Sequence, residues 1–333
     1  MIPVVVLGAS RLIGQALLQR LAGHPAFAVR ALCDLGPERP PMPYGEVCDW
    51  RMTSSMPTEL VTLDHHSGPA SSLSRLSKPG LLVLSVLPDG QSAEADRAFA
   101  EGGARVITHA EEWRLHPDIP LIIPDIHPIP SEPGIIATPN CTTVMLSLLL
   151  TALRNEHRID AVSVVALQAL SGADLTGPSA MDMLGNVDPH LDGEARALER
   201  ETGRIFSEEF PVSARCVRVP VNVGHTLLVS FKTRRPSELG DILTCLDDFR
   251  LTSARARTET AMERPFVLFR NPGRPRPVPD ADAGRGMALS IGGVARCPVL
   301  DWRCVLVGNN VERGSAATMV LTAEMLAQSL VDF

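Results

Sequence analysis

The chain has 333 residues, a formal net charge of -7 and a sequence pI of about 5.7. This acidic balance argues against non-specific binding to nucleic acid or to a membrane surface. No apolar run reaches the length that a membrane-spanning helix needs. The length fits two domains, and a composition of 45% hydrophobic and 21% charged residues is typical of a soluble globular enzyme.

The N-terminus and the cysteines indicate the compartment. Residues 1–8 read as a first β-strand without the basic stretch or cleavage site of a secretory signal, so we expect a cytoplasmic protein. The seven cysteines are an odd number and contain no Cys-x-x-Cys pair. We therefore expect reduced thiols, with neither a disulfide framework nor a metal site.

The first half of the chain alternates apolar strands with helical segments. We expect strands at 3–7, 28–33, 81–85 and 105–108, a helix at about 13–22, and an irregular proline-rich loop at 36–44. Continuous apolar strands are typical of a parallel sheet that is buried on both faces. The pattern predicts an α/β protein whose N-terminal domain is a Rossmann-type, doubly wound parallel sheet.

The second half is richer in strands. Prolines between 124 and 139 mark a crossover, followed by a helix at 142–154, strands at 159–167, 216–221, 226–232 and 304–307, and a long helix at 316–330. Antiparallel pairing of these strands predicts an α+β domain. We place the dinucleotide-binding domain at 1–138 and the catalytic and dimerisation domain at 139–309. Residues 310–333, with the last helix, return to complete the first domain.

A glycine-containing loop follows the first strand. The segment 8–14 (GASRLIG) opens a helix, which is where glycines let a backbone approach the pyrophosphate of a dinucleotide. Two glycines also occur in many strand–helix turns that bind nothing. The position of the loop favours the dinucleotide interpretation.

Cys141 lies between a proline-rich strand exit and an apolar helix, in the segment 138–143 (TPNCTT). Amides at a helix N-terminus stabilise a thiolate and bind an oxyanion, so this cysteine is a candidate nucleophile with a depressed pKa. The alternative is a buried structural cysteine.

His225 follows Gly224 at a strand start, where it is either a general acid/base or a surface histidine with no function. Gln168 ends a strand and is either functional or a turn ligand.

Together and in this order, these segments resemble the aspartate-semialdehyde dehydrogenases, in particular their archaeal and fungal branch. The resemblance runs from residue 3 to about 330. It is carried by segments 8–15, 85–88, 120–125, 139–143, 168–173, 186–190 with Glu194, 201–205, 212–220, 224–225, 282–288 and 308–316.

The resemblance implies a role for individual residues. Cys141 is the nucleophile, Gln168 orients the acyl intermediate and His225 is the general acid/base. Arg218 binds the substrate carboxylate, Glu194 its amino group and Arg114 its phosphate, with Asn140 beside them. The implied cofactor-binding residues are Gly8, Ser10, Arg11, Leu12, Ile13, Gly14, Asp34, Ser85, Leu87, Pro88, Ser171, Gly172 and Asn310, the last of which anchors the nicotinamide carboxamide.

The implied reaction reduces an acyl phosphate, 4-aspartyl phosphate, to an aldehyde. It proceeds through a thioester on Cys141 and a hydride from NADP or NAD, and it feeds lysine, threonine and methionine synthesis. The resemblance also implies a homodimer or homotetramer. The residue chemistry agrees independently, because a thiolate is a good nucleophile and its thioester accepts hydride.

The sequence departs from the family at four places. Arg11 replaces the middle glycine of the loop, and residues 34–38 (DLGPE) replace the serines that receive the 2′-phosphate of NADP. The segment 109–114 (HAEEWR) differs before Arg114, and Ala197 stands where the family has a lysine. Asp34 favours a ribose 2′-hydroxyl over a 2′-phosphate. Two alternatives stay open: a paralogous reductase of another acyl phosphate or thioester, and a cysteine-dependent acyltransferase without hydride chemistry.

Overall fold

The computed structural model describes residues 1–130, 134–174, 180–191, 193–251 and 258–331. The chain divides into two compact units. Unit 1 comprises Met1–Pro139, Thr258–Thr260 and Ser315–Phe333, and unit 2 comprises Asn140–Arg257 and Ala261–Gly314. The functional division into two domains remains a prediction. Within the described ranges, no helix has the length and apolar character that a membrane span requires.

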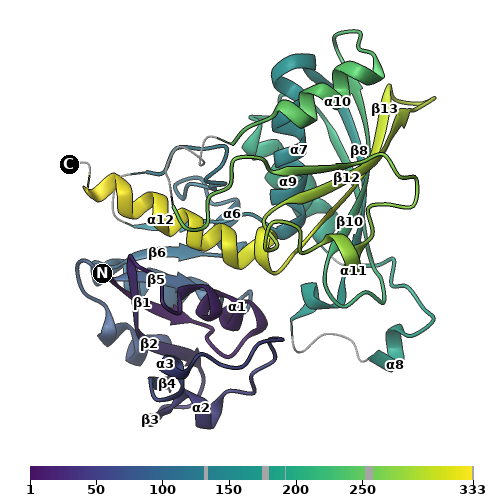
Figure 1. The fold of residues 1–333 in the computed structure, drawn as a ribbon. Helices are drawn as coiled ribbons and strands as arrows, with labels where there is room; N and C mark the ends of the chain where they lie inside the picture. Colours follow the sequence, from purple (N-terminus) through teal and green to yellow (C-terminus); the bar gives the residue numbers. More distant parts are fainter. Residues whose placement is uncertain (131–133, 175–179, 192, 252–257, 332–333) are drawn as a thin grey trace. The chain divides into compact units, whose positions relative to one another are not determined.

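Unit 1 is built on a seven-stranded sheet with the order β3-β4-β2-β1-β5-β6-β7 (Figure 1). Its strands are β1 (Ile2–Leu7), β2 (Phe27–Leu35), β3 (Arg39–Pro43), β4 (Asp64–Gly68), β5 (Leu82–Ser85), β6 (Arg105–Thr108) and β7 (Ile135–Ala137). All neighbours pair in parallel except β3 and β4. From β4 to β7 the order is that of dinucleotide-binding Rossmann folds, which confirms the predicted fold class.

The helices of unit 1 complete its core. They are α1 (Leu12–Leu21), α2 (Tyr44–Val47), α3 (Thr58–Val61), α4 (Ala70–Leu73), α5 (Ser92–Glu101), α6 (Glu111–Arg114) and α12 (Ala317–Val331). The C-terminal helix α12 packs against α1 and β6, so its predicted return to the first domain is confirmed. Residues 4–7 of β1 are at most 2% exposed, as a central parallel strand covered on both faces requires.

The segment 36–44 corrects the sequence analysis. We expected an irregular loop, but Arg39–Pro43 forms the edge strand β3, which pairs with β4 through Arg39–Ser67 and Met42–His65. Prolines have no amide hydrogen to donate, and an edge strand is the place in a sheet where that donor is dispensable. The prolines are therefore incompatible with a central strand of the sheet, but they are compatible with an edge strand.

Unit 2 is built on a six-stranded sheet with the order β11-β12-β13-β10-β8-β9. Its strands are β8 (Ile159–Gln168), β9 (Val212–Arg218), β10 (His225–Thr233), β11 (Phe266–Phe269), β12 (Leu289–Arg296) and β13 (Trp302–Gly308). The central pairs are antiparallel, but β8 pairs with β9 and β11 with β12 in parallel, so the sheet is mixed and not purely antiparallel as predicted.

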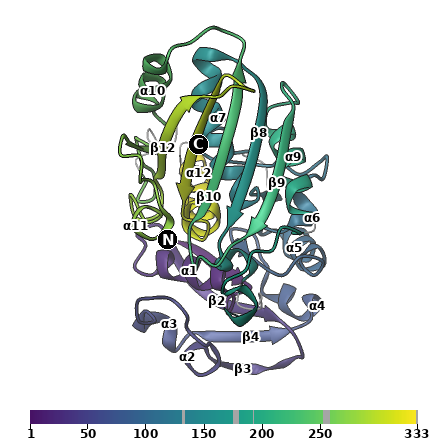
Figure 2. The ribbon, with the colours of Figure 1, turned by 90° about the vertical axis from the view of Figure 1, so that its right-hand side faces the viewer.

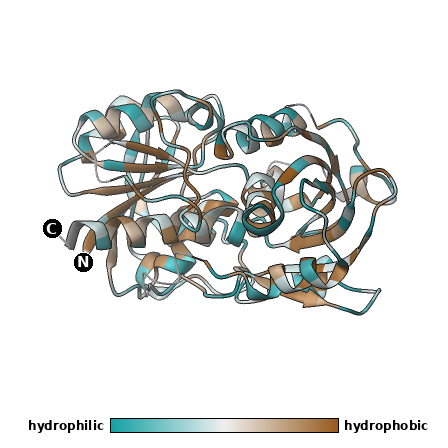
Figure 3. Cartoon of the chain, turned by 90° about the horizontal axis from the view of Figure 1, so that it is seen from above, coloured by the Kyte–Doolittle hydropathy of each residue, from teal (hydrophilic) through white to brown (hydrophobic). Residues whose placement is uncertain are grey.

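The helices of unit 2 are α7 (Cys141–His157), α8 (Ala180–Met183), α9 (Glu194–Ile205), α10 (Leu239–Asp248) and α11 (Pro277–Asp280). Figures 1 and 2 show α7, α9 and α10 on one face of the sheet. Figure 3 shows the strands largely in hydrophobic colours, whereas the helices carry residues of both kinds. A π-helix, Glu312–Ala316, precedes α12.

Candidate active site

The predicted nucleophile is the first residue of α7. Asn140 is the N-cap of this helix, and its Oδ1 accepts hydrogen bonds from the Thr142 amide at 3.0 Å and the Thr142 hydroxyl at 2.9 Å. The Cys141 thiol donates to the same oxygen at 3.4 Å. The cap therefore fixes the helix start and the direction of Sγ, at the end of a helix where backbone amides favour a thiolate.

Two carboxylates of α9 hold Asn140 from the other side. Glu194 Oε2 accepts from Asn140 Nδ2 at 3.2 Å and from Gln168 Nε2 at 2.8 Å. Glu201 Oε2 accepts from the Asn140 backbone amide at 2.7 Å, and Glu201 is 1% exposed. Glu194, Gln168 and Asn140 thus form one network beside Cys141, as expected for residues of one site.

Glu201 lies in the segment 201–205 that helps to carry the family resemblance, but the resemblance implied no role for it. It lies seven residues after Glu194, which places both carboxylates on the same face of the helix. That spacing, with an acidic residue on the buried face, is a signal that was available in the sequence.

His225 opens β10 and is fully buried. Its Nδ1 accepts a hydrogen bond from the Ala169 amide at 3.0 Å. Burial, reinforced by the nearby Arg218 guanidinium, lowers the pKa of His225 to about 3. The ring is therefore neutral at physiological pH, and because Nδ1 accepts, its proton is on Nε2. His225 Nε2 has no hydrogen-bond partner among the described residues and remains able to donate.

The peptide group of Ala169 holds two predicted site residues at once. Its amide binds His225, and its carbonyl oxygen accepts from Arg218 NH1 at 2.7 Å. Gly172 lies against both side chains: a Cβ there would be 2.6 Å from Arg218 NH1 and 3.0 Å from His225 Cε1. Glycine at this position lets the loop after β8 approach the pair closely.

Asn310 lies near the same loop. Its Nδ2 donates to Ser171 Oγ at 2.9 Å, and its Oδ1 accepts from the Gly224 amide at 3.0 Å. Gly224 has a φ of +101°, a conformation that disfavours other residues, and it directly precedes His225. The predicted residues Ser171 and Asn310 are thus tied to the start of β10.

Gly314 is a second residue that sequence reasoning missed. A Cβ on Gly314 would lie 2.4 Å from Cys141 Cβ and 3.0 Å from Cys141 Cα. Only glycine allows the π-helix to pass this close to the nucleophile. The sequence offered no signal for this contact beyond a glycine in a motif, because 173 positions separate the two residues.

In unit 1, the glycine loop lies where β1 and β5 leave the sheet. A Cβ on Gly8 would lie 2.7 Å from the Val86 carbonyl oxygen, and one on Gly14 would lie 2.1 Å from the Gly8 carbonyl oxygen. The loop thus adjoins Val86 and Leu87 beyond β5, at the point where the strand order reverses, and the predicted residue Pro88 follows them in the chain. Such a switch point, with a helix beginning at Leu12, fits the pyrophosphate of a dinucleotide.

Arg11 needs no strained backbone, because its φ of -73° and ψ of 160° suit any residue. Its charge acts on His109, whose pKa is lowered well below its usual value by burial, Arg114 and Arg11. Arg114 NH2 donates to the His109 carbonyl oxygen at 2.6 Å. His109 Nδ1 and Nε2 lie 3.0 and 3.2 Å from the hydroxyls of Thr138 and Ser315. Two arginines and a neutral histidine therefore gather near the loop.

Asp34 lies at the end of β2, next to the same loop. Its Oδ2 accepts from Ser10 Oγ at 2.7 Å and from the Ser10 amide at 3.2 Å, and it lies 2.7 Å from His65 Nε2. Its carboxylate thus already has partners on the glycine loop and on β4. His65 is a neighbour that no local pattern in the sequence indicated.

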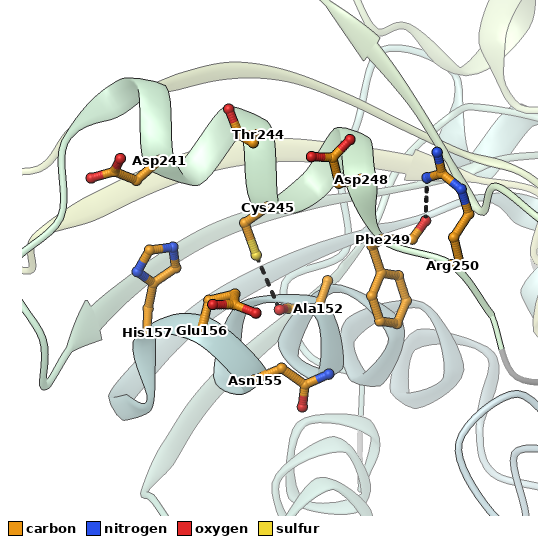
Figure 4. A pocket seen from close by; sticks show the side chains of 10 residues that line it. All are labelled: Ala152, Asn155, Glu156, His157, Asp241, Thr244, Cys245, Asp248, Phe249 and Arg250. Carbon is orange, nitrogen blue, oxygen red and sulfur yellow. Dashed lines mark hydrogen bonds between the residues drawn. The ribbon is translucent and has the colours of Figure 1, made fainter.

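Two hollows of unit 2 have none of the predicted site residues on their walls. One of about 560 Å³ lies between the end of α7 and α10, lined among others by His157, Cys245 and Asp248 (Figure 4). None of its lining residues belongs to the predicted site. Another of about 430 Å³ lies at the start of α9, beside Glu194, with Arg196 and Arg215 on its wall.

All seven cysteines are free thiols. Across the described ranges, no group of three or more His, Cys, Asp or Glu residues is arranged to hold a metal ion.

Comparison with known proteins identifies the family. The family model "Semialdehyde dehydrogenase, NAD binding domain" matches residues 3–131, and "Semialdehyde dehydrogenase, dimerisation domain" matches residues 150–313. The aspartate-semialdehyde dehydrogenase of Methanothermobacter thermautotrophicus is 31% identical over 99% of this chain and 100% of its own. A malonyl CoA reductase (NADP) of Metallosphaera sedula is 26% identical over 97% of both chains.

The structure is similar to that of Candida albicans aspartate semialdehyde dehydrogenase with NADP, with a TM-score of 0.86 and 28% identity over 97% of this chain and 98% of the other. Sequence profile, full-length identity and fold thus agree. The chain belongs to the aspartate-semialdehyde dehydrogenase family.

Proposed function

We propose that this chain is an NAD(P)-dependent aspartate-semialdehyde dehydrogenase that interconverts 4-aspartyl phosphate and the semialdehyde through a thioester on Cys141. The observation that carries the proposal is the network at the N-terminus of α7, where Asn140 accepts the thiol hydrogen and is linked through Glu194 to Gln168. The relatives that cover the whole chain and bear this name support it.

The covalent chemistry follows from the position of Cys141. Its thiolate adds to the acyl carbon, the bond from that carbon to the phosphate oxygen breaks, and phosphate leaves with the electron pair. The amides at the start of α7 offer donors for the oxygen that becomes negative. Gln168 would orient the acyl group, and its hydrogen bond to Glu194 supports this role because it fixes the side-chain amide.

His225 supplies a hydrogen bond to oxygen in this scheme. To accept a proton on Nε2 as a base, or to donate one as an imidazolium, the ring must carry a proton on Nδ1. Nδ1 instead accepts the hydrogen bond of the Ala169 amide, and a protonated Nδ1 could not accept it. The neutral ring with its proton on Nε2 supports the donor role, in which a carbonyl or alkoxide oxygen is stabilised without full proton transfer.

The substrate-binding residues remain proposals with separate support. Arg218 is 6% exposed, and its guanidinium lies close enough to His225 to act on it, a position that suits a substrate carboxylate. Glu194 suits an amino group, because its carboxylate already collects amide donors from Asn140 and Gln168. Arg114 and Arg11 supply positive charge in unit 1 that suits a phosphate.

The cofactor fits unit 1. The glycines let the loop pack closely before α1, whose N-terminal amides suit a pyrophosphate, and Ser10 and Asp34 would mark the ribose end. When bound, the nicotinamide group supplies or accepts the hydride that links thioester and aldehyde oxidation states. In unit 2, Asn310 and Ser171 would hold the carboxamide.

We propose a homodimer formed through the open face of the unit 2 sheet, and a cytoplasmic location. Leu228 is 42% exposed on this face and pairs in register with Val165 on β8 and Val305 on β13, so an apolar row crosses three strands. The description of the matching family model as a dimerisation domain supports this surface.

The test is a rate measurement in the oxidative direction. L-aspartate semialdehyde and phosphate are supplied with NADP or NAD, and the absorbance of the reduced nicotinamide is followed. We expect turnover that depends on phosphate and that Cys141→Ser abolishes. Absence of turnover with either cofactor would contradict the proposal.

A second candidate is the reduction of an acyl thioester such as a coenzyme A ester. Ala197 replaces the family lysine, and the hollow beside Glu194 carries Arg196 and Arg215, which offers room and charge for a larger anionic leaving group. The Metallosphaera relative supports this candidate. Acyl-CoA-dependent oxidation of NADPH without activity on the semialdehyde would favour it, and acyl phosphate consumption without hydride transfer would favour the acyltransferase.

A further inference from the structure

Glu201 is a buried carboxylate that has no role in the proposed reaction. It lies on the buried face of α9, is 1% exposed, and accepts the Asn140 amide at 2.7 Å. A carboxylate that accepts a backbone amide forms a charge-assisted hydrogen bond, which is shorter and stronger than a neutral one. Burial of such a group is costly unless its bonds are made, so this contact is a built feature and not a surface accident.

The contact acts on the residue that controls the nucleophile. Asn140 precedes Cys141, caps α7 through Thr142, and accepts the thiol hydrogen on its Oδ1. Its side chain is fixed at its other end by Glu194, and its peptide is fixed by Glu201. With the peptide and the side chain both held, the residue has little freedom to turn, and the direction of Cys141 Sγ is set with it.

We propose that Glu201 is a positioning residue for the nucleophile, acting on Cys141 through the backbone amide of Asn140. The inference rests on the proposed role of Cys141. Glu201 itself would touch no substrate. The two carboxylates of α9 then have different roles: Glu194 binds the side-chain amides of Asn140 and Gln168, and Glu201 binds the backbone amide of Asn140.

The charge of Glu201 should affect a measurable quantity, the pH at which the Cys141 thiol becomes a thiolate. A carboxylate near a thiol disfavours the thiolate, whereas the helix N-terminus favours it. Glu194, on the same helix, is a second carboxylate bound to Asn140, and it stays unchanged when only Glu201 is replaced.

The experiment compares Glu201→Gln, Glu201→Leu and the control Glu199→Gln. Glu199 lies on the same helix, and its Oε1 also accepts a backbone amide, that of Ala214 at 2.8 Å, but on β9. The rate of Cys141 alkylation by iodoacetamide is followed against pH by peptide mass spectrometry, with Cys297 as the internal reference.

We expect Glu201→Gln, which keeps an acceptor but loses the charge, to lower the pH midpoint of alkylation by about one unit. Glu201→Leu should lower kcat at least about tenfold with little change in KM, because the thiol is misdirected. Glu201→Gln should retain most of kcat, and Glu199→Gln should match the wild type in both measurements.

A midpoint for Glu201→Gln equal to that of the wild type, or a shift shared by Glu199→Gln, would overturn the proposal. Should Glu201→Leu fail to fold, the near-isosteric Gln variant still decides it. Alkylation needs neither substrate nor cofactor, so a failure here is distinct from a failure of the proposed enzymatic activity.

Discussion

The neutral state of His225 makes a quantitative prediction. Its pKa of about 3, against an ordinary value of 6.5, means that protonating the folded protein is harder than protonating the unfolded chain. The stabilisation from the neutral ring is complete above pH 6.5 and is lost as pH falls toward 3. Each pH unit of difference is worth about 1.36 kcal/mol, which gives about 5 kcal/mol in all and about 2 kcal/mol by pH 5.

The assay is chemical denaturation at pH 8 and pH 5 of the wild type, His225→Gln and His190→Gln. His190 is exposed and controls for the loss of a histidine as such. Between the two pH values the wild type should lose about 2 kcal/mol more stability than His225→Gln, and as much as His190→Gln. Nitrogen NMR of the ring should show the Nε2–H form throughout. Equal losses in all three proteins, or an imidazolium signal at pH 6, would refute the assignment of the ring as a neutral donor.

Three further predictions follow from close contacts, charge and burial. Gly314→Ala should lower kcat and the alkylation of Cys141 at least about a hundredfold, because its Cβ would lie 2.4 Å from Cys141 Cβ, whereas Gly240→Ala, with open space around it, should not. Asp34→Ser should raise the NADPH-to-NADH affinity ratio about tenfold in calorimetry, because it removes a charge that repels a 2′-phosphate; an unchanged ratio would show that Asp34 does not face the cofactor. Burial raises the pKa of Asp96 to about 6, so the free energy of unfolding should fall by about 3 kcal/mol as pH rises from about 4 to 6. In urea denaturation, Asp96→Asn should remove this pH dependence. If the variant keeps the same pH dependence, other groups cause it.

The sequence was most informative where a feature is local. The loop 8–14 after an apolar strand and the capped helix start at Cys141 are each contained within a few residues, so pattern and physics predict them together. The parallel sheet of unit 1 followed from continuous apolar strands. The mixed character of the unit 2 sheet did not, because β8 and β9 pair across a long connection that no local pattern reveals.

The parts of the site that could not be predicted depend on distance along the chain. Gly314 and Glu201 reach residues 140–141 from far along the chain, and His65 reaches Asp34 from a neighbouring strand. The protonation of His225 depends on burial and on one backbone amide, which a sequence does not display. Asp34 at the end of β2 could be identified in the sequence, but its hydrogen bonds with Ser10 on the glycine loop could not.

The proline-rich strand β3 has a consequence for the behaviour of the protein at high concentration. An exposed sheet edge offers a row of amides and carbonyls to any other extended chain, and growth from such an edge leads to aggregates. In β3, positions 40, 41 and 43 are prolines, so only Arg39 and Met42 carry an amide hydrogen. The outer rim of this sheet therefore cannot template another strand along its length. Replacing these prolines with strand-forming residues would open it, and light scattering during refolding would register the change.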